Sequence, residues 1–158
     1  MDAKFMKEAD ERRLNFMKSC GISISNDELN EDVWRKFYNN YLKADYVGDD
    51  ANTYQFKGNA GTIFNDISTS SFDDGTHHSW NVAYPDRLGT YGGSVACMTY
   101  VLGTADTAAI QYQGTYKLVN MGFPFETIVT EEARDNVMRD ILNFFNFNTA
   151  VENWELCY

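Results

Sequence analysis

The segment from Val47 to Gly93 constrains the fold most, because turn-forming residues interrupt it every few positions. Turn signals such as residues 73–75 (Asp-Asp-Gly) and residues 85–86 (Pro-Asp) separate short aromatic and β-branched runs. This pattern predicts small strands joined by long loops. Long irregular segments inside compact domains are often functional surfaces, so we look for binding residues here first.

The chain before this segment has helical and strand periodicity. Residues 3–19 place apolar side chains at helical spacing, and Gly21 follows as a candidate C-cap. Residues 22–25 (Ile-Ser-Ile-Ser) alternate like a short strand, and a second helix with apolar positions between residues 29 and 42 follows a cap at residues 26–27. The order helix, strand, helix is typical of α/β proteins, so we expect an α/β fold.

The chain after this segment predicts three strands and a closing helix. The strands are expected at residues 95–101, 107–112 and 116–121, with a Gly-containing hairpin loop between the last two. Pro124 ends the pairing because it has no N–H to donate. Thr130 is a candidate N-cap for the last helix, followed by acidic residues that suit a helix N-terminus. Its predicted buried stripe is Val137, Met138, Ile141, Leu142 and Phe145.

Length and charge exclude several classes of partner. A chain of 158 residues fits one domain, with a core large enough to fold without a metal or a disulfide. Its 13 basic and 23 acidic side chains give a net charge of −10, which disfavours nucleic acid and anionic membrane surfaces. No apolar run is long enough to span a bilayer, and the first residues lack the apolar centre of a signal peptide.

The cysteines and one serine are the candidate nucleophiles. Cys20, Cys97 and Cys157 are widely spaced and show no zinc-ligand pattern. Cys20 would need His77 or His78 as its base, and the alternative is a packed thiol at the end of the first helix. Ser25 lies at the predicted strand-to-helix turn, where it is either a low-grade catalytic candidate or a helix cap.

The densest group of metal-ligand side chains is Asp73, Asp74, His77 and His78. Carboxylates around a glycine turn can bind Ca²⁺, and a pair of histidines can bind a transition metal. The same residues are also ordinary turn formers, and adjacent residues of an extended segment point to opposite sides. We therefore keep both a metal site and a simple turn as interpretations, and we expect no cofactor.

Two aromatic residues and one acid complete the candidates. Trp80 and Tyr84 lie in the Gly- and Asp-rich segment and are the expected exposed pair for stacking on sugar rings. Glu126 would act as a general acid or base if it were buried. Its alternative role is to cap or pair at the start of the last helix.

Several short motifs resemble a known family. They are residues 40–47 with 49–51, residues 84–86, residues 110–112, residues 116–119, and residues 122–128 (Gly-Phe-Pro-Phe-Glu-Thr-Ile). Together they resemble the C-terminal half of a flavodoxin-like domain found in secreted bacterial proteins, many described as xanthan lyases and some as peptidases. The resemblance covers residues 14–147 and implies a three-layer flavodoxin-like sheet, an extracellular or cell-surface location and a polysaccharide as ligand.

A more distant resemblance, to class I glutamine amidotransferases, tests whether such a domain is catalytic. Those enzymes place a Phe-His-Pro-Glu element after a hairpin, where this chain reads residues 123–126 (Phe-Pro-Phe-Glu). Glu126 matches the acidic residue, but Pro124 stands where the catalytic histidine would be. The turn after residues 22–25 also lacks the nucleophilic cysteine and its glycines.

The resemblance therefore implies a non-catalytic structural or carbohydrate-binding module. The alternative is a polysaccharide hydrolase or lyase with a degenerate amidotransferase-like site. The net charge of −10 makes an acidic polysaccharide such as xanthan a poor direct substrate. If residues 1–158 are the later part of a larger parent domain, the sheet has an open edge, which predicts a homodimer or association with the upstream half.

Overall fold

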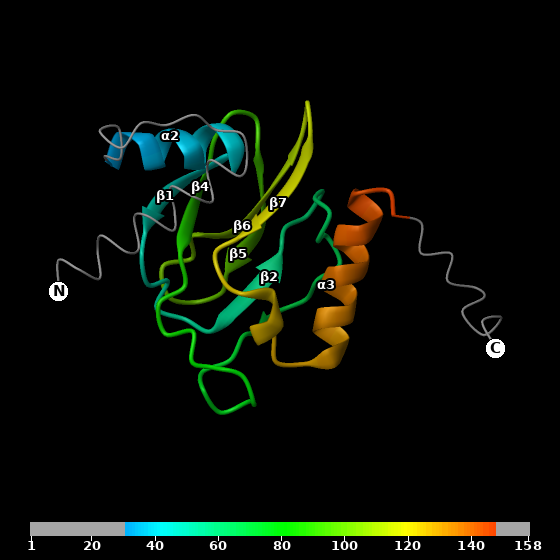
Figure 1. The fold of residues 1–158 in the computed structure, drawn as a ribbon. Helices are drawn as coiled ribbons and strands as arrows, with labels where there is room; N and C mark the ends of the chain where they lie inside the picture. Colours follow the sequence, from blue (N-terminus) through cyan, green and yellow to red (C-terminus); the bar gives the residue numbers. More distant parts are fainter. Residues whose placement is uncertain (1–30, 148–158) are drawn as a thin grey trace, which may run out of the picture.

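The computed structural model describes residues 31–147, with side chains from residue 35 onward. This part of the chain contains helices α2 (Glu31–Tyr41) and α3 (Glu131–Phe144) and the short 3₁₀ helix η2 (Phe125–Thr127). Its seven strands are β1 (Ala44–Gly48), β2 (Gln55–Gly58), β3 (Ser70–Ser71), β4 (Arg87–Thr90), β5 (Val95–Tyr100), β6 (Thr107–Gln113) and β7 (Lys117–Met121). Figure 1 shows the strands gathered into one twisted sheet, with α2 and α3 at different places around it.

All seven strands belong to one sheet, and every pairing in it is antiparallel. The order is β1-β4-β6-β5-β2-β3, and β7 also pairs with β6. β7 pairs with residues 109–113 of β6, whereas β4 pairs with β6 at Thr107. Where β7 ends, Gly122 donates to the carbonyl of Ala108 and accepts from the N–H of Asp86, both at 2.8 Å. This junction between β7 and β4 positions the candidate site.

The expected α/β flavodoxin-like, amidotransferase-like three-layer sheet is therefore wrong. A parallel sheet needs a crossover of a dozen or more residues between neighbouring strands, and that crossover is usually a helix. Here no helix lies between β1 and β7, and successive strands are joined by turns and loops. The turn-rich sequence of residues 47–93 correctly predicts short strands joined by loops, whereas the helix, strand, helix pattern before residue 43 does not indicate the fold class of the described residues. The predicted helix at residues 3–19 and strand at residues 22–25 lie outside the described residues.

The elements after residue 93 are close to those predicted from the sequence. β5, β6 and β7 cover the three expected strand segments, and residues 114–116 form the turn between β6 and β7. Thr130 is the N-cap of α3, and its side-chain oxygen accepts a hydrogen bond from the N–H of Ala133 at 3.3 Å. Of the predicted stripe, Val137 is fully buried, whereas Met138 is 38% exposed.

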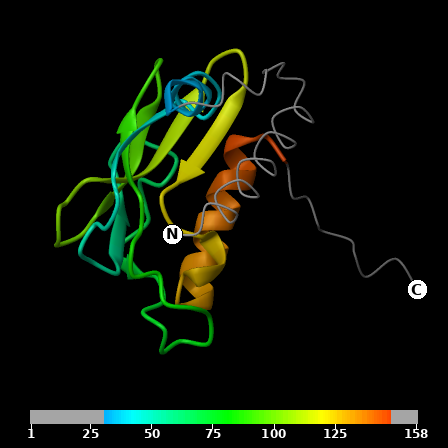
Figure 2. The ribbon, with the colours of Figure 1, turned by 60° about the vertical axis from the view of Figure 1, so that its left-hand side comes forward.

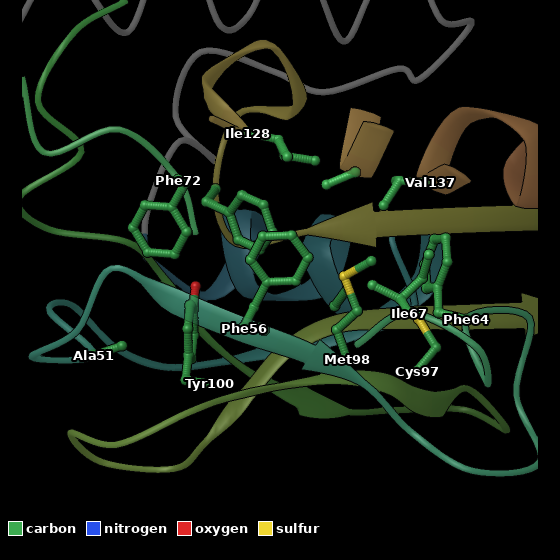
Figure 3. Close-up of a cluster of buried hydrophobic side chains, with 14 of the residues drawn as sticks. Ala51, Phe56, Phe64, Ile67, Phe72, Cys97, Met98, Tyr100, Ile128 and Val137 are labelled. Atoms are coloured by element: carbon green, nitrogen blue, oxygen red, sulfur yellow. The ribbon is translucent and has the colours of Figure 1, made fainter. Parts of the chain in front are cut away.

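The main core lies between the sheet and α3 and is rich in aromatic rings. Phe72 is its centre, because its ring lies 4.8 Å from Phe123 and 6.4 Å from Phe56, and Tyr100 meets it edge-on. Figure 3 shows the rings of Phe72, Phe56 and Tyr100 below Ile128, with Met98 and Cys97 to one side. Each buried aromatic side chain removes a large apolar area from water, so this cluster is the main source of stability for the described domain.

A smaller core lies under α2. It joins Ala44, Leu88 and Ile110 of the sheet to the half-buried side chains of Tyr38 and Leu118. Figure 2 shows α2 end-on at the top of the sheet, and α3 beside the sheet. Among residues 31–147, no helix is both long and apolar enough to cross a membrane.

Candidate functional site

An open hollow of about 530 Å³ lies at the junction where β7 ends and β4 begins. Its volume is within the range of small-molecule sites in proteins. One wall is the loop before β4 and the other is the segment that follows β7. The lining residues are Trp80, Asn81, Val82, Ala83, Tyr84, Pro85, Asp86, Met121, Gly122, Phe123 and Pro124.

The loop of residues 73–82 carries one side of this hollow. Its two ends are tied by the Val82 N–H, which donates to the Asp73 carbonyl at 3.0 Å. The N–H of Asp73 in turn donates to the carbonyl of Thr127 at 2.9 Å, which joins the loop to η2. Figure 1 shows this loop as the green excursion at the bottom of the molecule, next to η2.

The carboxylate of Asp73 organises the loop from within. This side chain is fully buried and accepts hydrogen bonds from the backbone N–H groups of Gly75, His77 and Ser79 at 2.7, 3.0 and 2.8 Å. Burial opposes ionisation of Asp73, but these three donors outweigh it and lower its pKa. The backbone at Gly75 has a φ of +94°, a conformation that glycine adopts without strain.

The other three metal-ligand candidates are arranged as parts of the same turn. Asp74 accepts from the hydroxyl and the N–H of Thr76, at 2.6 and 3.0 Å, and the Thr76 hydroxyl is the main cause of its lowered pKa. His77 and His78 are exposed. Within residues 31–147, no three His, Cys, Asp or Glu side chains are placed to hold a metal ion together. The structure thus gives Asp73 and Asp74 roles in building a loop.

Trp80 and Tyr84, the predicted sugar-stacking residues, line the same hollow and are 51% and 70% exposed. Residues next to them in the sequence are held by hydrogen bonds. The side-chain oxygen of Asn81 accepts from the Tyr54 hydroxyl at 2.8 Å, and the backbone N–H of Asp86 donates to the carbonyl of Gly122. In the described chain neither ring is paired with another aromatic ring, and at least half of each residue's surface is exposed to solvent.

Asp86 is the charged residue of the hollow. Its side chain is half-buried, and burial raises its pKa, with a further contribution from the negative charge of Asp49. The buried Tyr100 hydroxyl donates at 2.8 Å to the backbone carbonyl of Asp86 and not to its carboxylate. Between residues 31 and 147, no hydrogen bond to this carboxylate is formed. A partly desolvated carboxylate without a protein donor is a group to which a polar ligand can donate.

The remaining candidate residues do not join this hollow. Glu126 is exposed on η2 and is not among the lining residues. Cys97 is buried in the core, where burial raises its thiol pKa to about 12, so it is not a nucleophile. Ser25, Cys20 and Cys157 lie outside the described residues.

Sequence reasoning missed Asp86 as a site residue, although it named residues 85–86 as a turn signal. A Pro-Asp pair is common in turns, so it does not by itself indicate a ligand site, and no neighbouring residue indicates that Asp86 is half-buried. The signal that could have identified it is its proximity along the chain to Trp80 and Tyr84. The return of residues 121–124 to the same place depends on the strand pairing.

A second hollow, of about 240 Å³, lies at the start of α3 between residues 66–70 and residues 130–136. Its lining is mainly hydroxyl, amide and carboxylate side chains, with no aromatic ring. Thr130 already satisfies one of the free N–H groups there by capping α3. The hollow beside Asp86 is therefore the better candidate for a ligand site.

Comparisons of the chain with protein-family models, with curated proteins and with solved structures find no match.

Proposed function

We propose that this domain is a non-catalytic carbohydrate-binding module and that Trp80 and Tyr84 bind the sugar. The observation that carries the proposal is that these two exposed rings line one hollow of about 530 Å³. A pyranose ring has apolar C–H faces and a rim of hydroxyl groups. It therefore suits a site that combines aromatic faces with a few polar acceptors.

The polar groups of the hollow fit the rim of a sugar. Asn81 and Asp86 line the hollow with the two rings. The amide oxygen of Asn81 accepts from the Tyr54 hydroxyl, and the carboxylate of Asp86 has no hydrogen-bond donor in the described chain. Both accept hydrogen bonds from hydroxyl groups. Backbone hydrogen bonds at Val82 and Asp86 anchor the segment that carries the two rings, which lowers the entropy lost on binding.

The arrangement favours binding over hydrolysis. Glycosidases typically use two carboxyl groups that flank the bond to be broken. Asp86 is the one carboxyl residue that lines the hollow, and the exposed Glu126 lies outside its lining. The hydrolase or lyase alternative therefore has no second group in this site.

The direct test is calorimetric titration with a panel of neutral tetrasaccharides, using the full chain and the variants Trp80→Ala and Tyr84→Ala. We expect at least one neutral oligosaccharide to bind, and each variant to weaken it by about tenfold, which corresponds to about 1.4 kcal/mol. Tyr91→Ala is the matched control, because Tyr91 is also exposed but does not line the hollow.

Two results would contradict the proposal. One is the absence of binding by every sugar at millimolar concentration, and the other is binding that Trp80→Ala and Tyr84→Ala leave unchanged. Turnover of the oligosaccharide that is lost in Glu126→Ala or Ser25→Ala would replace the binding function with the enzyme alternative.

A further inference from the structure

We infer that the hollow selects sugars that carry a free amino group, with the carboxylate of Asp86 as the counter-ion of the ammonium and the rings of Trp80 and Tyr84 around it. This inference rests on the proposed carbohydrate-binding function and names the class of sugar. The structural basis is the charge of the lining, the environment of Asp86 and the two exposed aromatic rings.

The lining carries one formal charge, and it is negative. Among the eleven residues around the hollow, Asp86 is the one acidic residue and no Lys, Arg or His is present. A uronic acid or another anionic sugar would bring a like charge to a site with no cation to receive it, which disfavours binding. A protonated amine would instead meet an opposite charge.

The neighbouring charge that acts on Asp86 is also negative and adds to the negative potential of the site. Asp49 adds a second carboxylate charge. The carboxylate of Asp86 in turn raises the pKa of the Tyr38, Tyr46 and Tyr100 phenols, which are therefore neutral at pH 7. These groups leave the negative potential of the site in place at neutral pH.

Arg87, the basic residue next to Asp86 in the sequence, is bonded to other groups. The guanidinium of Arg87 donates at 3.0 Å to the carboxylate of Asp106 and at 3.1 Å to the backbone carbonyl of Asp49. Its charge is therefore shared with Asp106. The carboxylate of Asp86 has no protein cation bonded to it in the described chain, and an ammonium from a ligand can take that place.

The aromatic rings strengthen the preference for a cation. Trp and Tyr faces attract an ammonium group through the ring quadrupole, and the attraction grows as the cation is desolvated. Trp80 and Tyr84 line the hollow together with Asp86. A carboxylate beside exposed aromatic rings is a favourable environment for an organic cation. An amino sugar also supplies the ring that stacks and the hydroxyl groups that bind Asn81.

The test is calorimetric titration of the full chain with two tetrasaccharides that differ at one position, the β-1,4 oligomer of glucosamine and its fully N-acetylated form. Acetylation removes the charge and keeps the ring and most hydroxyl groups. We expect the glucosamine oligomer to bind at least about tenfold more tightly at pH 6 and low salt, and to lose most of that advantage at high salt.

Asp86→Asn is the decisive variant, because asparagine keeps the shape of the side chain and removes its charge. We expect this variant to bind the two oligomers with similar affinity, through a loss of affinity for the glucosamine form alone. Asp135→Asn is the control, since Asp135 is exposed on α3 and outside the hollow, and it should keep the preference. Circular dichroism on each variant checks that it is folded.

The outcomes separate this inference from the proposed function. Equal binding of the two oligomers by the native chain, or a preference that survives in Asp86→Asn, would overturn the amino-sugar inference. If Trp80→Ala still weakened the binding of those oligomers, the carbohydrate-binding function would be supported and only the preference for amino sugars would be wrong. If neither oligomer nor any neutral sugar bound, both proposals would fail.

Discussion

At the scale of single residues, two aspartates of similar sequence context have opposite environments. Asp73 is fully buried but accepts three backbone N–H groups, and its pKa is lowered. Asp86 is half-buried without such donors, and its pKa is raised. The first carboxylate is ionised to hold a loop, and the second is left available for a ligand. Each makes the stability of the protein depend on pH, with opposite sign.

Asp73→Asn should destabilise the protein at neutral pH, because a neutral amide replaces the charged acceptor of three N–H groups. A lowered pKa in the folded state contributes stability above the unfolded pKa of about 3.9 and loses it as the pH falls through the folded value. Urea unfolding should show a gap between the native chain and the variant at pH 7 that narrows below about pH 4. A gap that is constant with pH would contradict the role of this carboxylate.

Asp86→Asn should have the reverse effect. A raised pKa means that the folded state binds the proton more tightly, so stability falls as the pH rises from about 3.9 through the folded value. The variant removes that loss and should be slightly more stable than the native chain at pH 7, with no difference below about pH 4. The same urea series measures it, and a variant less stable at pH 7 would show that the carboxylate has a structural partner.

At the scale of elements, α3 is the part of the fold for which sequence rules work best. Its first residues contain a capping threonine followed by Glu131 and Glu132, and the structure has this N-terminus where the sequence predicts it. Here the helix end is determined by local chemistry, which a sequence displays directly.

Thr130→Ala should therefore lower the free energy of unfolding by about 1 kcal/mol through loss of the hydrogen bond to Ala133. Thr130→Ser keeps the hydroxyl and is the matched control. Thermal unfolding of both variants measures the effect. A serine variant as unstable as the alanine variant would show that the methyl group matters more than the cap.

The strand pairing shows what local chemistry does not determine. The sequence predicts the hairpin of β6 and β7, which the structure confirms, but it does not predict that β4 also pairs with β6, beside β7. Antiparallel pairing depends on which apolar faces are buried together, and this is a property of the complete sheet. The exposed pair Trp80 and Tyr84 could be predicted from a loop-rich segment. The third member of the site, Asp86, needed the tertiary structure.

At the scale of the whole molecule, an aromatic core joins the sheet to α3. Phe72 follows the two-residue edge strand β3, and the centroids of four aromatic rings lie within 6.4 Å of the centroid of its own ring. The loop of residues 73–82 begins at the next residue. The core therefore fixes one end of the loop that carries Trp80.

Phe72→Ala should cost about 3–5 kcal/mol of unfolding free energy, because it leaves a cavity between fully buried neighbours. Phe147→Ala is the control, since Phe147 is 63% exposed and its loss should change stability by less than about 0.5 kcal/mol. Chemical denaturation of the two variants measures both values. Similar costs for the two would contradict the core described here.

The association of this chain with itself stays a prediction. It was derived from an incomplete parallel sheet, and the antiparallel sheet removes that reason. Among the described residues, β1 pairs with β4 alone, and Tyr46 and Val47 on it are about half exposed. Light scattering at several concentrations measures the oligomeric state directly.

The most direct test of the central claim is to map sugar binding onto the structure by nuclear magnetic resonance. The full chain, labelled with ¹⁵N, is titrated with the glucosamine tetrasaccharide and with a neutral tetrasaccharide. The account predicts that amide shifts change chiefly in residues 80–86 and 121–124, together with the side-chain N–H of Trp80. Saturable changes centred elsewhere, or no change with either sugar at millimolar concentration, would contradict it.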